Sequence, residues 1–143
     1  MLFTNLEIAA DGKQTELDNL IVNANGVFIV EVKNYYGELF GDEEDYDWIK
    51  TKMTSGGSFY QKTVKNPIKQ VKRQVYILSR YMKSNGLNAW INGYVFFVQR
   101  NCPVESPYVL KTQMDLDNAI HGNIVNALSV EEIEQIKELF YHG

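Results

Sequence analysis

Residues 15–34 read TELDNLIVNANGVFIVEVKN, an apolar stretch with charged side chains at both of its outer ends. Its middle predicts a buried β-hairpin. Asn25-Gly26 is a strong signal for the tight turn, because both central residues of such a turn need positive φ. Acidic and lysine side chains are rarely buried without a partner. The charged residues of this hairpin are Glu16, Asp18, Glu31 and Lys33. Their presence at the ends of a buried hairpin therefore needs a physical reason.

A two-residue turn at Asn25-Gly26 predicts that Asp18 lies opposite Lys33. Since side chains alternate between the two faces of a strand, the four charged residues should all project from one face, with cross-strand Cβ separations of roughly 5 Å. The other face carries apolar residues such as Phe28. Both faces of the hairpin therefore need cover, which predicts an α/β fold in which helices pack on a sheet.

Carboxylates crowded at the edge of a core repel one another and lose hydration unless a cation compensates them. Hard oxygen ligands suit Mg²⁺ or Mn²⁺, which take one or two protein carboxylates and keep several waters. We therefore predict that Asp18 and Glu31 hold a divalent metal ion with Lys33 beside it. A carboxylate–lysine salt bridge at a strand end is an equal alternative for Asp18 with Lys33.

The rest of the sequence predicts further strands and helices in one domain, residues 1–143. The clearest helix begins at Asn66-Pro67, which supplies an N-cap and a proline at the first helical position, and it ends at Asn85-Gly86. The apolar run at 94–98 is typical of a central strand covered on both faces. Other predicted elements are strands near 1–8, 47–50, 57–60 and 108–111, an acidic loop at 41–47, a helix at 115–120, and a C-terminal helix capped by Ser129 with Glu132.

The net charge of −4 hides an uneven distribution along the chain. Residues 1–47 hold eleven acidic and two basic residues, whereas residues 48–104 hold ten basic residues and no acidic one. A concentrated basic segment indicates a polyanionic partner such as DNA, although solvated surface residues would give the same pattern. The predicted nucleic-acid-binding residues are Lys62, Lys65, Lys69, Lys72, Arg73 and Arg80.

Cysteine content and hydropathy restrict the setting of the protein. Cys102 is the only cysteine, which excludes an internal disulfide and a cysteine-based zinc site. No apolar run approaches the roughly 18 residues that a membrane span needs, and the N-terminus lacks the pattern of a signal peptide. We therefore expect a cytoplasmic protein without a membrane partner.

The hairpin ends in E-V-K-N-Y-Y-G, and the later helix opens with N-P-I-K-Q. Together with the preceding T-E-L-D, these motifs resemble the NERD (nuclease-related) domain, a branch of the PD-(D/E)XK nuclease superfamily related to Mrr-type restriction endonucleases. The likeness runs from about residue 2 to residue 98. It implies a restriction-endonuclease-like mixed β-sheet flanked by helices. By position, it implies metal binding by Asp18, Glu31 and the backbone carbonyl of Val32, activation of water by Lys33, and contact of Gln70 with phosphate or the attacking water.

One departure from the family pattern concerns the start of the chain. Nucleases of this type usually begin with a helix that carries an extra acidic residue, and here the first predicted element is a strand. Glu16, two residues before Asp18, is a candidate substitute ligand. The resemblance implies metal-dependent hydrolysis of phosphodiester bonds in DNA. The absent helix leaves two alternatives, a nucleic-acid-binding module that does not cut and a domain that forms a homodimer through the uncovered sheet face.

Overall fold

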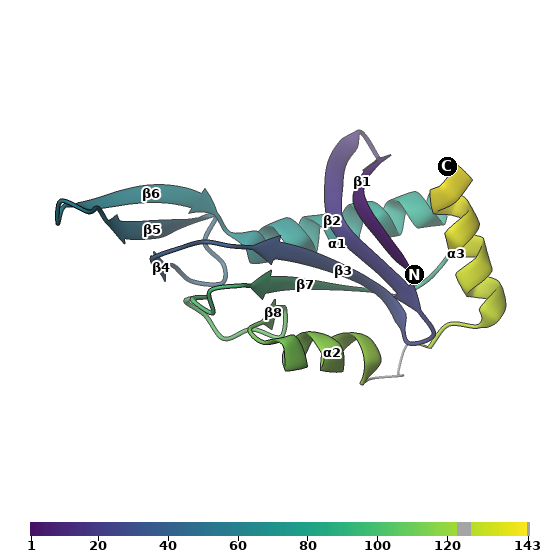
Figure 1. Ribbon diagram of the computed structural model, residues 1–143. Coiled ribbons are helices and arrows are strands. Elements are labelled where there is room, and N and C mark those ends of the chain that lie inside the picture. Colours follow the sequence, from purple (N-terminus) through teal and green to yellow (C-terminus); the bar gives the residue numbers. More distant parts are fainter. Residues whose placement is uncertain (123–126, 143) are drawn as a thin grey trace.

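The computed structural model describes residues 1–122 and 127–142, which form a mixed sheet with helices on both faces and a second, smaller sheet beside it (Figure 1). This arrangement confirms the predicted α/β class. The elements are, in chain order, β1 (Leu2–Ala10), β2 (Lys13–Asn23), β3 (Gly26–Lys33), β4 (Glu38–Phe40), β5 (Asp47–Met53), β6 (Phe59–Lys65), α1 (Pro67–Ser84), β7 (Ile91–Phe97), β8 (Val109–Leu110), α2 (Gln113–His121) and α3 (Val130–His142).

The larger sheet has five strands in the order β1-β2-β3-β7-β8. The first three are antiparallel neighbours, whereas β3, β7 and β8 run parallel. Parallel neighbours need a crossover connection, and here the connection from β3 to β7 includes the second sheet and α1. The second sheet has three antiparallel strands in the order β4-β5-β6.

Helix α1 begins where the sequence predicts. The Asn66 side chain accepts a hydrogen bond from the backbone N–H of Ile68, and Pro67 occupies the first helical position. The carboxamide of Asn66 also donates to the carbonyls of Glu43 and Asp45, at 2.7 and 2.8 Å. One capping residue therefore starts the helix and fixes the acidic loop against it.

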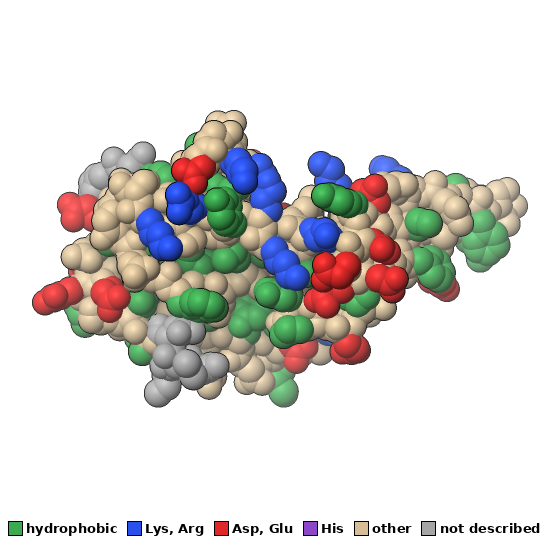
Figure 2. All heavy atoms as spheres, turned by 180° about the vertical axis from the view of Figure 1, so that it is seen from behind, with side chains coloured by type: hydrophobic (Ala, Val, Ile, Leu, Met, Phe, Trp, Pro, Cys, Tyr) green, Lys and Arg blue, Asp and Glu red, His purple; other side chains and the backbone are tan. Residues whose placement is uncertain are grey.

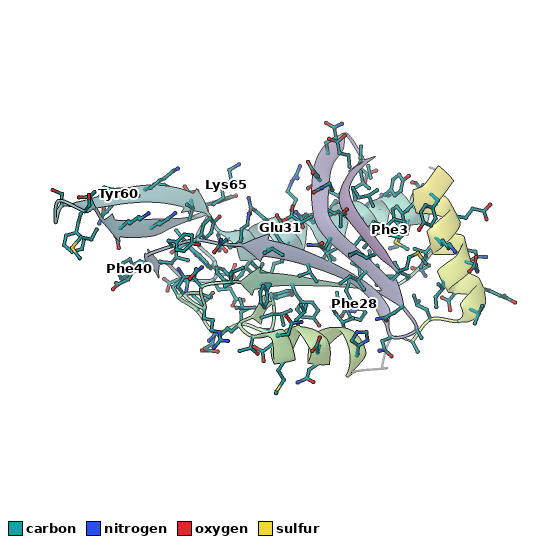
Figure 3. The ribbon with its side chains drawn as sticks, in the orientation of Figure 1. Phe3, Phe28, Glu31, Phe40, Tyr60 and Lys65 are labelled. Atoms are coloured by element: carbon teal, nitrogen blue, oxygen red, sulfur yellow. The ribbon has the colours of Figure 1, made fainter. Side chains whose placement is uncertain are left out.

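Both faces of the central hairpin are covered, as predicted. On one face, Val27 and Ile29 of β3 lie in the main core with Val71 and Leu78 of α1. On the other face, a smaller cluster joins Phe28 and Val30 of β3 to Ile120 of α2. Helix α3 extends the main core, and its Phe140 ring lies 5.6 Å from that of Phe3, which Figure 3 labels near the helix. The apolar faces of β3 thus place its charged end at the margin of the main core.

The hairpin register differs from the prediction by two residues. The turn residues are Ala24 and Asn25, so that Asn23 pairs with Gly26 and Asn19 with Val30. The Asn23 side chain accepts a hydrogen bond of 2.8 Å from the backbone N–H of Asn25, which stabilises this earlier turn. The predicted pairing of Asp18 with Lys33 was therefore wrong, and the observed register, continued by one residue, sets Asp18 opposite Glu31.

The three-stranded sheet extends away from the main body as an arm, defined here as β4, β5 and β6 with their connections (Figure 1). Its root is held by Trp48, which is fully buried, donates through Nε1–H to the Asp42 carbonyl at 2.9 Å and stacks on Phe97. At Gly37, with φ of +92°, a Cβ would lie 2.2 Å from the Thr51 carbonyl oxygen. Only glycine permits this approach, so the arm is fixed to the end of β3.

Three other structural outcomes bear on the sequence predictions. The Ser129–Glu132 capping box is present, since each residue accepts a hydrogen bond from the backbone N–H of the other. Asp11-Gly12, which connects β1 to β2 with positive φ at both residues, is a hairpin signal that the sequence analysis missed. Within the described residues, no helix combines the length and the apolar composition that crossing a membrane requires.

Candidate functional site

The carboxylate of Glu31 is the centre of the candidate site. Glu31 is buried, with 7% of its surface exposed, at the end of β3 where the strand leaves the main core (Figure 3). Its Oε2 accepts a hydrogen bond of 3.2 Å from Gln74 Nε2, and its Oε1 lies 3.7 Å from Lys33 Nζ. A buried carboxylate is therefore held between an amide donor on α1 and an ammonium group on its own strand.

Asp18 is the second carboxylate of the cluster. Its Oδ2 accepts a hydrogen bond of 3.4 Å from the backbone N–H of Val32, which places it beside the end of β3. Burial raises the pKa of the Glu31 carboxyl above its ordinary value, and the charge and side-chain hydrogen bond of Asp18 raise it further. The hydrogen bond from Gln74 and the charge of Lys33 act in the opposite direction on this pKa. The two carboxylates thus form a pair with excess negative charge.

Glu16 lines the same groove as Glu31, and its role as a substitute ligand stays a prediction. Leu17 and Leu20 both lie in the main core although they are three residues apart, so the alternation of faces is interrupted between them. The neighbouring strand β1 is irregular at the same level. Its Asn5 has a φ of +50° and lies between Thr4, which pairs with Asn19, and Leu6, which pairs with Leu17. The Glu16 side chain is exposed, and the residue contributes its backbone carbonyl, which accepts a hydrogen bond of 3.4 Å from Gln74.

Gln74 is a candidate site residue that the sequence analysis did not identify as one. The resemblance pointed to Gln70, which lies one turn earlier on α1 and lines the same groove. Gln74 is buried and contacts Glu31 directly. It is three residues after Val71 and four before Leu78, so it falls on the apolar stripe of the helix, and a polar residue on such a stripe was the available signal. The Oε1 atoms of both glutamines are buried without a hydrogen-bond partner in the described part of the chain.

A groove of about 720 Å³ opens beside Glu31, between the first half of α1, the beginning of β2 and the root of the arm. Lys65, Lys69 and Arg73 line it, and Figure 3 shows Lys65 on β6 near Glu31 on β3. The Lys69 ammonium lies 4.0 Å from Glu44 Oε2 and 4.9 Å from the centre of the Tyr46 ring. Glu16, Glu31 and Asp47 line the same groove, so cationic and carboxylate side chains border one cavity.

The structure brings together only part of the predicted basic set. Figure 2 shows Lys and Arg side chains spread over the face of the molecule that α1 occupies. Lys72 lies over the Tyr108 ring at 4.8 Å and lines a different groove, of about 470 Å³, on the other side of α1. Arg80 forms a 2.8 Å ion pair with Asp11, and Lys62 lies on the arm. The groove beside Glu31 therefore contains three of the six predicted cations.

The donor set fits a divalent cation that keeps most of its own waters. Asp18 and Glu31 supply two carboxylates, which is the number that Mg²⁺ usually takes from a protein. The raised pKa of Glu31 means that its charged form lacks full compensation, as expected at a carboxylate that a cation would stabilise. No group of three or more His, Cys, Asp or Glu side chains with metal-binding spacing occurs in residues 1–122 and 127–142. Further ligands at Val32 or Glu16 remain predictions.

The comparisons with known proteins agree with the motifs around this site. The family profile of the nuclease-related domain matches residues 1–98, which include Asp18, Glu31, Lys33 and Gln74. An uncharacterized protein of Bacillus anthracis is 35% identical over 48 residues, which cover 34% of this chain and 23% of that relative. The match thus spans about a quarter of the relative's length. No solved structure matches the chain significantly. Because the family profile covers more than half of the sequence, this chain belongs to the nuclease-related domain (NERD) family.

Proposed function

We propose that this protein hydrolyses phosphodiester bonds in DNA with the help of Mg²⁺ or Mn²⁺. The observation that carries the proposal is the buried Glu31 carboxylate, which lies beside Asp18 and Lys33 and opens onto a groove lined by Lys65, Lys69 and Arg73. Two carboxylates next to an anion site are the arrangement that a metal-assisted attack on phosphate requires. A purely structural salt bridge would not need the adjoining cationic groove.

The proposed roles follow from the contacts of each side chain. Asp18 and Glu31 would hold the metal ion, which when bound supplies Lewis-acid stabilisation of the phosphate and a more acidic water. Gln74 holds the orientation of Glu31 through its 3.2 Å hydrogen bond. Lys33 lies close enough to Glu31 to neutralise negative charge that grows at the phosphate and to position the attacking water. Gln70, with a buried and unpartnered Oε1 in the groove, is the candidate contact to that water.

The groove cations would bind the sugar–phosphate backbone and carry no sequence code. Lys65, Lys69 and Arg73 come from the end of β6 and the first two turns of α1, so their spacing is fixed by two elements of the fold. Backbone contacts of this kind position the nucleic acid and make its affinity strongly dependent on salt. We therefore expect tight binding at low ionic strength and little preference among DNA sequences.

We further propose that the chain belongs to the Mrr-like branch of the PD-(D/E)XK nucleases. The support is the Asp on β2, the Glu-x-Lys at the end of β3, and the approach of α1 to that strand end through Gln74. The spacing of these groups comes from two neighbouring antiparallel strands, as the family pattern requires.

A cleavage assay with plasmid DNA in Mn²⁺ or Mg²⁺ tests the activity. Wild type should nick or linearise the plasmid, whereas Asp18→Asn and Lys33→Ala should lose the activity by at least about a hundredfold. Lys137→Ala, which removes a cation from α3 far along the chain from the site, is the matched control and should cut like wild type. Equal trace cutting by wild type and Lys33→Ala would refute the proposed hydrolysis.

The alternative candidate is a nucleic-acid-binding module that does not cut. It is favoured by one contact, the 3.7 Å approach of Lys33 Nζ to Glu31 Oε1, which already compensates one of the two carboxylates. Under this alternative, DNA binding should be insensitive to Asp18→Asn and should fall in Lys65→Ala combined with Lys69→Ala. Binding without metal-dependent cleavage in highly purified protein would favour it over hydrolysis.

A further inference from the structure

The arm carries two chemically different faces. Cross-strand pairs along β5 and β6 alternate between the faces, as in any antiparallel pair. The pair of Trp48 with Val64 lies at the root of one face, and the next pairs on that face are Lys50 with Lys62 and Lys52 with Tyr60. We call this the lysine face. The opposite face carries exposed apolar side chains, and they are Phe40, Ile49, Met53 and Phe59.

Lys50 and Lys62 pair directly across the two strands. Like charges in this position repel each other and destabilise the pair. Within the described residues, neither lysine forms an ion pair with a carboxylate, and residues 48–104 contain no acidic residue at all. Lys50 and Lys62 therefore carry positive charge that no ion pair in the described residues neutralises, and an external anion would stabilise it.

The lysine face is connected to the candidate site through Tyr35. The Lys50 ammonium lies 5.6 Å from the centre of the Tyr35 ring, and the Lys33 ammonium lies 5.9 Å from the same ring. Asn101 holds this segment in place, since its carboxamide donates hydrogen bonds of 2.8 Å to the carbonyls of Tyr35 and Gly37. A series of cationic and aromatic side chains thus runs from Lys33, beside Glu31, outward along the arm.

We propose that the lysine face, together with Tyr35, is a second nucleic-acid-binding surface that holds the strand of nucleic acid leaving the carboxylate pair. The inference rests on the proposed function for the identity of the polymer. Lys50, Lys52 and Lys62 would contact backbone phosphates, and the exposed ring of Tyr60 would offer a stacking surface for a base. The seven residues of β5 extend about 23 Å, which corresponds to about six or seven phosphates of one strand.

The geometry favours nucleic acid over a lipid surface as the anion. A membrane-binding ribbon would insert its apolar side chains and keep cations at the lipid headgroups around them. Here Lys50, Lys52 and Lys62 project from the face opposite the exposed apolar side chains, so one flat lipid surface could not contact both sets. Lys65, which pairs with Asp47 at the root of the arm, lies on the apolar side. Figure 2 shows hydrophobic side chains on the arm when the molecule is seen from behind. A polyanion that follows the lysine face would neutralise the lysines without contacting the apolar side chains on the opposite face.

Binding in EDTA tests this surface independently of cleavage. Fluorescence anisotropy would use a short labelled DNA that fills the groove and a DNA extended by about seven nucleotides, in single-stranded and double-stranded forms. Wild type should bind the extended DNA more tightly. Lys50→Ala combined with Lys62→Ala should remove that gain and reduce the slope of log affinity against log salt by about one for each lysine. Lys50→Arg with Lys62→Arg should retain the gain, and Lys137→Ala is the control for loss of a cation elsewhere.

Thermal melts of the same variants exclude unfolding as the cause, because removal of one like-charged pair should not lower stability. Wild-type binding by the double alanine variant would overturn the proposed surface, even if the protein cuts DNA. Preferential binding of wild type to vesicles rich in phosphatidylserine would overturn it in favour of a lipid partner. Loss of the length-dependent gain in the variant, with no cleavage by wild type, would support the surface while refuting hydrolysis.

Discussion

The carboxamide of Gln74 on α1 donates a 3.2 Å hydrogen bond to the buried carboxylate of Glu31 at the end of β3. This contact joins the helix to the strand end that carries the Glu-x-Lys motif, and it lowers the pKa of a carboxyl that burial raises. The same carboxamide donates to the Glu16 carbonyl on β2. One side chain therefore links the three elements that surround the candidate site, which makes it a positioning residue with several measurable effects.

Gln74→Leu should raise the pKa of Glu31 further, because it removes the hydrogen bond that favours the charged carboxylate. At pH values where Glu31 is ionised, the free energy of unfolding should fall by about 1–3 kcal/mol. NMR titration of the Glu31 side-chain carboxyl measures the first effect, and urea unfolding measures the second. Gln70→Leu is the matched control, since it removes an amide of the same helix that makes no hydrogen bond with Glu31. Equal pKa values in the two variants would contradict the assigned contact.

The stability of the metal-free protein should depend on pH through Glu31. A carboxyl with a higher pKa in the folded than in the unfolded protein binds more protons when folded, so stability falls as pH rises between the two values. The unfolded value is about 4.5, and the folded value lies above it, mainly because of burial. Unfolding free energies in EDTA should therefore decrease as pH rises above 4.5 in wild type. Subtraction of the Glu31→Gln curve isolates this decrease, and parallel curves for both proteins would rule out the raised pKa.

Much of this fold could be predicted from local signals, and the exceptions have identifiable physical causes. Asn66-Pro67 specified the start of α1 because cap and proline geometry are local. The register of β2 with β3 could not be predicted, because the Asn23 side chain selected a turn one residue earlier than the Asn25-Gly26 signal suggests. A shift of two residues keeps each side chain on the same face of the strand. Asp18 therefore stays close to Glu31, and the predicted cluster of Asp18, Glu31 and Lys33 is still formed.

The sequence could not show which basic residues lie in the groove beside Glu31 and which lie elsewhere. Lys69 and Lys72 are one turn apart on α1, yet they line different grooves on opposite sides of the helix. Which side adjoins the carboxylates depends on how the helix packs on the sheet, a long-range property set by buried residues such as Val71 and Leu78. Periodicity identified the apolar stripe but could not show which of its flanks faces Glu31.

The groove cations and Arg80 should therefore behave differently in DNA binding. Lys65→Ala with Lys69→Ala should weaken binding and lower the salt slope by about one for each lysine, because both line the groove beside Glu31. Arg80→Ala should have little effect, since Arg80 forms its ion pair with Asp11 outside this groove. Anisotropy titrations over a range of salt concentrations distinguish the two cases. A loss in Arg80→Ala as large as in the double variant would place the DNA along the whole of α1.

Gly37→Ala should destabilise the junction between the arm and β3. A Cβ at this position would lie 2.2 Å from the Thr51 carbonyl oxygen, and the φ of +92° is unfavourable for any other residue. Gly57→Ala is the matched control, because its φ of +83° is equally unfavourable but no atom lies within 4 Å. Urea unfolding should show a larger loss for Gly37→Ala, by more than about 1 kcal/mol over the control. Equal losses would mean that backbone strain alone matters and that β4 adjusts without cost.

Metal binding should stabilise the protein only when both carboxylates are present. Removal of one charge from the pair relieves repulsion, so Asp18→Asn and Glu31→Gln should keep or gain stability in EDTA, relative to wild type. Mn²⁺ or Mg²⁺ at a hundredfold excess over Kd should stabilise wild type by about 2.7 kcal/mol, the linkage expected for one site. Both variants should lose most of this gain, while Lys137→Ala keeps it. Thermal melts of the four proteins in EDTA and in Mn²⁺ measure both the metal-free stability and the gain from metal. Identical melting of all four proteins under both conditions would mean that Asp18, Glu31 and Lys33 form only a salt-bridge cluster at a strand end.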